Sequence, residues 1–356
     1  MERGQVLRFR FGRHELHRQA GPRSTPWRCS TTGIQDTGTD GAAWALALRG
    51  ASGSWSPDLA LAWTLRGAPH AYRRPDLAGV AVATAPFSEA DAAKRIFDAS
   101  RPLKAAGIGM VEALDGVAAA MREVVTAPMV KGEVSTRLAE RMAEPYLRWC
   151  RPCRATHLYE QTFRLAAVRA GLELEPGTSP PVLRPVPGFR VAEEVPERLD
   201  VIRGCLRLLG PAAPKLVAEF LDAPVKDVKA RWPADAVEVT VEGETRWLLG
   251  ELQGEPPETT RLLGPYDLFL QARDRSLLVP DPARAKALWP VLGRPGAVLH
   301  GAELVGLWRP RKAGRRFVVQ VEPFGPVPPA LQAAIGEQAE RLAAYRGVAL
   351  TAVELT

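Results

Sequence analysis

Three polar side chains with hydrogen-bonding chemistry follow one another in a single turn. Gln35, Asp36 and Thr37 supply an amide, a carboxylate and a hydroxyl, and the turn leads into the apolar, tryptophan-containing stretch 43–49. A glutamine amide has one acceptor and two donors, so it can orient a water molecule. A packed helix behind the turn would fix these groups in place. The stretch therefore indicates a candidate hydrolytic site.

The same stretch also has a purely structural interpretation. A polar turn containing glycines is typical of a helix entry, in which Asp40 caps a helix that starts near Ala42. Gln35 would then only satisfy backbone groups of the turn. The residues alone leave both interpretations open.

A second polar motif, Arg66-Gly67-Ala68-Pro69-His70, ends the next apolar stretch. In one interpretation His70 lies near the pocket for the damaged base or contacts a phosphate. In the other, Gly67 supplies a backbone angle that suits glycine, and His70 packs at the rim of a strand-entry turn.

Together the two motifs resemble a tandem winged-helix DNA-binding family that includes the azinomycin-resistance (AlkZ-like) DNA glycosylases. In that family the first turn reads roughly Gly-Leu-Gln-Ala-Gln-Asp-Pro and the later stretch Leu-Arg-Gly-Thr-x-His. Here the corresponding residues are Gly33-Ile34-Gln35-Asp36-Thr37 and Leu65-Arg66-Gly67-Ala68-Pro69-His70. A hairpin with glycine and Trp308 near the C-terminus is also similar.

The resemblance implies a monofunctional DNA glycosylase that hydrolyses the N-glycosidic bond of alkylated or bulky N7-adducted purines. The family's water-holding motif is Gln-x-Gln or Gln-x-Asp. Gln35 matches the first position, Thr37 stands at the third and Asp36 lies between them. Gln35 would orient the water, and Asp36 or Thr37 would assist. Because N7 alkylation lets the purine leave as a neutral group, orientation can supply much of the effect.

The resemblance further implies damaged double-stranded DNA as the partner, with no cofactor. A bulky adduct would not need full extrusion into a closed pocket, in contrast to ordinary base flipping. The alternative is a non-enzymatic winged-helix DNA-binding protein, a regulator or lesion sensor. Formation of abasic sites in alkylated DNA distinguishes the two.

The charge pattern favours nucleic acid. The chain has 356 residues and a formal net charge of +7, and 39 of its 47 basic residues are arginine. Arginine suits phosphate oxygens and guanine edges. Basic residues cluster within 8–18, 148–157 and 309–316, as a long anionic partner would require. An arginine-rich composition is also typical of a GC-rich genome.

Several basic side chains are candidates for contacts with DNA. They are Arg13, His14, Arg66, His70, Arg154, His157, Arg164, Lys229, His300 and Arg311. No apolar run is long enough to cross a bilayer, and the first residues lack an apolar signal core. We expect a cytoplasmic protein that is nucleoid-associated when bound to DNA.

The segment Cys150-Arg151-Pro152-Cys153 has three interpretations. It is similar to a thioredoxin active-site string, but the strand–helix context is missing. With His157 it offers three zinc ligands, where a structural site needs four. We expect ordinary packing beside a recognition helix, and no metal.

The pattern of elements predicts an α+β fold. It consists of tandem winged-helix units (helix-turn-helix plus β-wing) and a C-terminal β-hairpin and helix segment. The expected units are 1–85, which holds the candidate active turn, 86–195, 196–252 and 253–356.

Within the first unit we expect helices at 43–49 and 59–66 and a wing within 71–84; residues 6–11 form a strand or open a helix. Further expected helices lie at 109–125, 129–142, 157–170, 199–209, 213–221, 225–232 and 330–345. Expected hairpins pair 172–174 with 182–184, 237–241 with 245–249, and 297–299 with 304–308, and a further strand is expected at 317–321. A Pro-rich linker is expected around 254–260.

Overall fold

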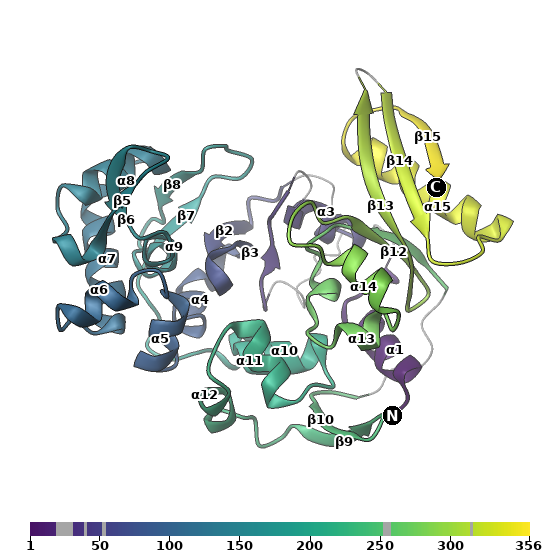
Figure 1. Cartoon of the computed structure of the whole chain (residues 1–356), viewed down its shortest axis with the longest axis horizontal. Coiled ribbons are helices and arrows are strands. Elements are labelled where there is room, and N and C mark those ends of the chain that lie inside the picture. The colour runs from purple at the N-terminus through teal and green to yellow at the C-terminus, as the bar shows by residue number, and fades with distance from the viewer. Residues whose placement is uncertain (19–30, 39–40, 52–54, 252–257, 314–315) are drawn as a thin grey trace.

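The computed structural model describes residues 1–18, 31–38, 41–51, 55–251, 258–313 and 316–356. Within that part, helices alternate with two larger sheets and two separate hairpins, which confirms the expected α+β class. The chain begins with α1 (Arg3–Arg13), so residues 6–11 belong to a helix. Figure 1 shows the C-terminal sheet at one end of the molecule and the helices of residues 89–169 at the other. Cys29, Asp40 and most of the expected Pro-rich linker lie outside the described residues.

A six-stranded antiparallel sheet carries the Gln35 turn. Its order is β1-β3-β2-β7-β8-β4. The strands are β1 (Ile34–Gln35), β2 (Leu59–Trp63), β3 (Pro69–Arg73), β4 (Met129–Val130), β7 (Leu172–Leu174) and β8 (Val182–Pro185). The expected first and second units therefore contribute strands to one sheet.

Two expectations for the first unit are wrong. The helix expected at 59–66 is strand β2, and all five of its residues are buried. A strand covered on both faces has a continuous apolar sequence, which periodicity does not distinguish from a buried helix. The wing expected within 71–84 is also wrong, because β3 ends at Arg73. The 3-10 turn η2 (Arg74–Asp76) and helix α4 (Leu77–Ala83) follow it.

A group of helices packs on β2 and β7 around a second core. Its elements are α5 (Glu89–Arg95), α6 (Ser100–Ala105), α7 (Met110–Val124), α8 (Lys131–Ala139), η3 (Glu144–Tyr146), β5 (Leu147–Cys150), β6 (Ala155–Leu158) and α9 (Glu160–Arg169). Ser88 caps α5, as its side-chain oxygen accepts a hydrogen bond from the Asp91 amide at 3.2 Å. The helix expected from His157 begins only at Glu160, and His157 lies in β6.

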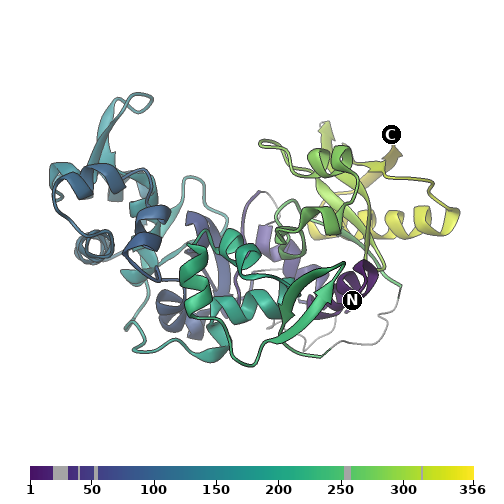
Figure 2. The same ribbon diagram turned by 60° about the horizontal axis from the view of Figure 1, so that its bottom comes forward.

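The next segment runs helix, helix, helix, hairpin. Its elements are η4 (Glu197–Leu199), α10 (Val201–Leu209), α11 (Pro214–Leu221), α12 (Val225–Ala230), β9 (Val237–Val241) and β10 (Glu244–Leu248). Asp200 caps α10 by accepting hydrogen bonds from the amides of Ile202 and Arg203. The N-terminus lies beside the β9–β10 hairpin in both views (Figure 2), where the Met1 amino group donates to the Thr240 carbonyl oxygen.

The C-terminal residues form a five-stranded sheet in the order β11-β12-β13-β14-β15. Strands β14 and β15 run parallel, and helix α15 connects them. The elements are β11 (Thr260–Leu263), η5 (Leu268–Gln271), α13 (Arg275–Leu278), α14 (Pro282–Leu288), β12 (Gly296–His300), β13 (Glu303–Ala313), β14 (Arg316–Pro323), α15 (Pro329–Tyr345) and β15 (Leu350–Leu355).

The largest core joins distant parts of the chain. Apolar residues of α1, of α3 (Gly41–Leu48), of α10–α12 and of the C-terminal sheet form one buried cluster. The helix that follows the Gln35 turn is therefore surrounded by residues more than 150 positions later in the sequence. The division into units at residues 85, 195 and 252 stays a proposal. In it, unit 1–85 shares a sheet with unit 86–195 and a hydrophobic core with units 196–252 and 253–356.

Candidate active site

The two motifs found in the sequence lie on neighbouring strands. Strand β1 pairs with β3, which places Ile34 opposite Ala71 and Gln35 opposite His70. The Asp36 amide donates to the Pro69 carbonyl oxygen at 2.8 Å and extends this pairing by one residue. The turn that carries Gln35 is thus held against the segment that follows Arg66.

The Gln35 side chain is oriented by hydrogen bonds at both ends of its amide. Its Nε2 donates to the Thr37 Oγ1 at 3.0 Å. Its Oε1 accepts a longer hydrogen bond from the Arg66 Nη2 at 3.5 Å. Because an amide oxygen has two lone pairs, Oε1 retains acceptor capacity, and the Thr37 hydroxyl hydrogen remains available to donate. These two groups offer both kinds of hydrogen bond that a positioned water needs.

Asp36 joins the turn to helix α3. Its Oδ1 accepts a hydrogen bond from the Ala42 amide at 2.8 Å, in the first turn of the helix. Gly41 has φ +34°, and a Cβ there would lie 1.9 Å from the same oxygen, so a side chain at this position would displace the carboxylate. Burial raises the pKa of Asp36, and the Ala42 hydrogen bond opposes this effect. Asp36 therefore acts as a cap in this structure.

Helix α3 is anchored to the C-terminal part of the chain. The Trp44 Nε1 donates to the Leu262 carbonyl oxygen at 2.8 Å. The Arg49 guanidinium makes two hydrogen bonds of 2.8 and 2.7 Å to the carboxylate of Asp267, and both side chains are buried. Burial alone would raise the pKa of Asp267, but the adjacent Arg49 charge lowers it overall. The helix that follows the Gln35 turn is therefore held in a fixed position by the C-terminal part of the chain.

Arg66 occupies a left-handed backbone conformation beside Gln35. It lies in the tight turn η1 (Leu65–Gly67), where Arg66 has φ 59° and ψ 21° and Gly67 has φ +67°. A non-glycine residue in this region is uncommon and is held there by its surroundings. Burial, and then the nearby charge of Arg273, lower the pKa of Arg66 to about 10, so the group is cationic at neutral pH. The special angle expected at Gly67 is confirmed.

Two histidines expected at the DNA surface are interior residues instead. His70 is buried, and its Nδ1 lies 2.9 Å from the Ala68 carbonyl oxygen and 3.1 Å from the Thr64 hydroxyl. His14 is buried as well, with its Nε2 3.0 Å from the Leu208 carbonyl oxygen. Burial lowers both pKa values to about 3, with neighbouring arginines adding to the effect. Both side chains therefore lie in the interior of this structure and are neutral at neutral pH.

A cavity of about 290 Å³ opens beside Gln35 and Thr37. Three arginines line it, namely Arg294, Arg309 and Arg346. Arg294 lies over the ring of Tyr266 at 5.1 Å, and the Arg309 Nη1 donates to the Gly293 carbonyl oxygen at 2.6 Å. The cavity is therefore positively lined and has an aromatic wall.

Sequence reasoning misses these lining residues as a group. Arg309 stands out in the sequence only as one member of a basic cluster, and Tyr266, Arg294 and Arg346 follow or precede different elements of the C-terminal segment. No motif joins them. They meet at Gln35 only because the β12–β13 pairing and the end of α15 bring them to the entry of α3.

The remaining DNA-binding candidates differ in exposure. Arg154, Lys229 and Arg311 are exposed. Arg13 is half-buried and lies over the ring of Phe9 at 5.3 Å. His300 is half-buried and its Nε2 lies 2.7 Å from a Glu258 carboxylate oxygen.

Arg164 instead supports the turn at Gly67. Its Nη1 donates to the Gly67 carbonyl oxygen at 3.1 Å and its Nε donates to Glu160 at 2.6 Å. With these bonds satisfied internally, Arg164 stabilises the loop that carries Arg66.

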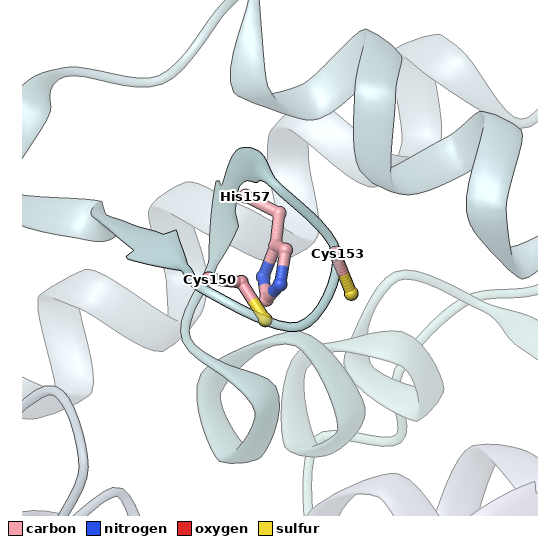
Figure 3. A group of neighbouring side chains, drawn as sticks. All are labelled: Cys150, Cys153 and His157. Carbon is pink, nitrogen blue, oxygen red and sulfur yellow. The ribbon is translucent and has the colours of Figure 1, made fainter.

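The two cysteines of the Cys-x-x-Cys segment are not packed in the interior, which corrects the expectation of ordinary packing. Cys150 is half-buried, Cys153 is exposed, and both thiols lie close to the imidazole of His157 (Figure 3). A hydrogen bond from the Cys153 backbone, and next the neighbouring His157 side chain, lower the pKa of Cys150 to about 7.

The comparisons with known proteins identify the class of protein to which this mixed α and β chain belongs. The chain belongs to the AlkZ-like DNA glycosylase family, whose model it matches over residues 56–345. The expected glycosylase class is thereby confirmed, and the partner of such an enzyme is DNA. The Gln35 turn lies before the matched residues, so its role rests on geometry.

The structure is similar to that of the Streptomyces sahachiroi DNA glycosylase AlkZ, with a TM-score of 0.72 and 19% sequence identity. The similarity covers 99% of this chain and 98% of that one, so the two share a fold throughout. No curated protein sequence matches the chain. Among the described residues, every helix is too short or too polar to span a lipid bilayer.

Proposed function

We propose that this glycosylase hydrolyses the N-glycosidic bond of alkylated or bulky N7-adducted purines in double-stranded DNA, with Gln35 holding the attacking water. The observation that carries the proposal is the Gln35–Thr37 hydrogen bond of 3.0 Å at the edge of the arginine-lined cavity. This pair places a hydrogen-bond acceptor, the Gln35 Oε1, beside a donor, the Thr37 hydroxyl, on a turn that is held in place.

The chemistry requires little acid or base assistance. An N7-alkylated purine carries a positive charge, so it departs as a neutral base and leaves an oxocarbenium-like sugar. Water must then be held at the anomeric carbon, and orientation by fixed dipoles supplies most of the effect. The Gln35 Oε1 accepts a hydrogen bond from this water and points the water's oxygen at the sugar.

We assign the other two turn residues supporting roles. Thr37 holds the Gln35 amide in one orientation and offers its hydroxyl to the same water. Asp36 fixes the turn to α3 by accepting a hydrogen bond from the Ala42 amide. Gln35 and Thr37 are the catalytic residues in this proposal, and Asp36 is a positioning residue.

The cavity suits a sugar and water better than a whole adduct. Its volume of about 290 Å³ lies at the small end of ligand pockets. A purine that carries a bulky N7 substituent would remain largely outside it. This size supports excision without full enclosure of the damaged base, while Arg294, Arg309 and Arg346 bind the flanking phosphates.

We also propose winged-helix units for DNA binding. The order α10, α11, α12 and β9–β10 supports such a unit in 196–252, with Lys229 exposed on the helix before the hairpin. In 86–195 the hairpin β5–β6 follows α8, and the hairpin β7–β8 follows α9, so either α8 or α9 precedes a hairpin as a recognition helix would. Exposed Arg154 and Arg311 extend the proposed contacts with phosphates.

Duplex DNA with a single N7-methylguanine tests the proposal. The wild-type protein should produce abasic sites, and Gln35→Ala should lower the single-turnover rate by about 10²-fold through loss of water orientation. Gln332→Ala, which removes an exposed glutamine from α15, should leave the rate unchanged. Wild-type protein that binds this DNA without forming abasic sites above background would support the non-enzymatic alternative.

A further inference from the structure

We propose that Cys150, Cys153 and His157 form a zinc-binding site on the β5–β6 hairpin, with a solvent molecule as the fourth ligand. Their ligating atoms all lie within 4.8 Å of one another, and the part of the chain that the structure describes adds no fourth protein ligand to this group. The site lies on a different sheet from the Gln35 turn and has no part in the proposed hydrolysis.

The hairpin register brings the three residues together. Cys150 pairs with Ala155, and Arg148 pairs with His157. Side chains two residues apart share a face, so Cys150 and His157 are diagonal neighbours on one face of the hairpin. Cys153 belongs to the connecting turn, which Arg154 closes with a left-handed φ of 50°. Figure 3 shows the Cys150 sulfur beside the His157 ring and Cys153 across the turn.

The imidazole of His157 is oriented as a metal ligand requires. Its Nδ1 lies 2.8 Å from the Leu158 carbonyl oxygen, which accepts only from a protonated nitrogen. The proton therefore resides on Nδ1, and Nε2 carries the free lone pair. Metal-binding histidines are commonly fixed by this kind of hydrogen bond to a backbone carbonyl.

The chemistry of the three ligand atoms favours zinc over other metal ions. Two thiolates and one imidazole suit Zn²⁺, which binds sulfur at about 2.3 Å and nitrogen at about 2.0 Å in tetrahedral geometry. Ligand atoms in such a site are separated by roughly 3.3–3.8 Å. Because the three ligand atoms here already lie within 4.8 Å of one another, side-chain rotations that bring them at most about 1.5 Å closer would complete the geometry. Cys153 is exposed and Cys150 is half-buried, so both thiols are accessible to a metal ion.

A metal would stabilise an otherwise weak element. The β5–β6 sheet contains only two strands, and only its base, at Leu147 and Leu158, packs against the second core, whereas Trp149, Ala155 and Thr156 nearer the turn are exposed. The hairpin presents the exposed side chains of Arg148, Trp149 and Arg151. A zinc ion bound by both strands and the turn would fix the orientation of these side chains.

Zinc content and cobalt spectroscopy of the full-length protein test the site. The protein, loaded with zinc and dialysed, should retain stoichiometric metal, and Co²⁺ should give thiolate-to-cobalt charge-transfer bands and tetrahedral d–d bands. Cys150→Ser and Cys153→Ser should each weaken zinc affinity by more than about 100-fold, beyond the effect of changing a residue that only supports a ligand. Cys205→Ala, which removes a buried cysteine outside the group, should retain the metal.

Three outcomes would overturn the site: wild-type protein without bound zinc, zinc retained by the Cys150→Ser/Cys153→Ser variant, or a Cys150–Cys153 disulfide in place of metal. Circular dichroism confirms that each variant is folded. None of these readouts depends on glycosylase activity, so a failure here leaves the proposed function untouched.

Discussion

Gln35 depends on Thr37 for its orientation, because the Thr37 hydroxyl is the close partner of the amide nitrogen. Replacing Thr37 with valine keeps the shape of the side chain but removes the hydrogen bond. A neutral hydrogen bond is worth about 1 kcal/mol, so we expect Thr37→Val to lower the single-turnover rate of abasic-site formation by roughly 5-fold to 10-fold. Thr37→Ser retains the hydroxyl and should keep most of the rate. A wild-type rate in Thr37→Val would remove Thr37 from the mechanism.

The carboxylate of Asp36 can be tested separately from its capping oxygen. Asp36→Asn retains an acceptor for the Ala42 amide but has no charge. If Asp36 only positions the turn, the variant should keep a near-wild-type rate and stability. Asp36→Ala should lower the free energy of unfolding by about 1 kcal/mol through loss of the cap. A rate loss of tenfold or more in Asp36→Asn would instead show that the charge stabilises the sugar cation.

At the residue scale, the sequence predicts the side chains that interact within one short segment, such as those of the Gln35 turn. Gln35 and Thr37 are two residues apart, and their amide and hydroxyl meet within one turn. The burial of His14 has no local signal, because its partners Leu208 and Arg49 are distant in the sequence. His70 has partners in its own turn, Thr64 and Ala68, but its burial also depends on how that turn packs in the fold. Arg294, Arg309 and Arg346 could not be predicted to line one cavity with Gln35, because they too are distant from it in the sequence.

At the scale of elements, helix α3 is the link between the active turn and the C-terminal sheet. Its buried Arg49–Asp267 pair is bidentate, and removing one partner leaves an uncompensated buried charge. We expect Asp267→Ala to lower the free energy of unfolding by about 3–5 kcal/mol, measured by urea denaturation. Glu133→Ala breaks an exposed ion pair with Arg137, in which each side chain is 51% accessible. This change should lower the free energy of unfolding by less than about 1 kcal/mol. Equal effects of the two changes would contradict this assignment.

The elements that the sequence mispredicted share a physical cause. Strand β2 is covered on both faces, so its sequence lacks the alternation of apolar and polar residues that marks a half-exposed strand. Most helices from residue 110 onward were predicted within a few residues, because each has one apolar face and a clear beginning or end, as α7 and α10 do. The pairing of β2 with β7, through Leu61 and Leu174, depends on an alignment of distant segments that no local pattern encodes.

At the scale of the whole molecule, the two buried histidines make stability depend on pH. Their pKa is about 3 in the folded protein and 6.5 when exposed, so the unfolded chain binds protons first as the pH falls. Stability is therefore complete above pH 6.5 and decreases below it. Between pH 6.5 and 5 each histidine should remove about 2 kcal/mol from the free energy of unfolding. His14→Asn should reduce this pH dependence in urea titrations at about pH 7 and pH 5. A pH-independent free energy over this range would contradict the burial of both rings.

The binding constant for DNA should fall as the salt concentration rises. Only the basic residues that contact phosphates should contribute to this salt dependence. Removing one such residue reduces the slope of log K against log salt by about 0.9. We expect Lys229→Gln and Arg311→Gln, both exposed in the proposed interface, each to weaken binding and to reduce the slope by about this amount. Lys104→Gln removes the same net charge from an exposed residue of α6, outside the proposed interface, and should leave the slope unchanged. Because all three variants lower the net charge equally, an identical slope change in all of them would show that net charge, and not this surface, determines binding.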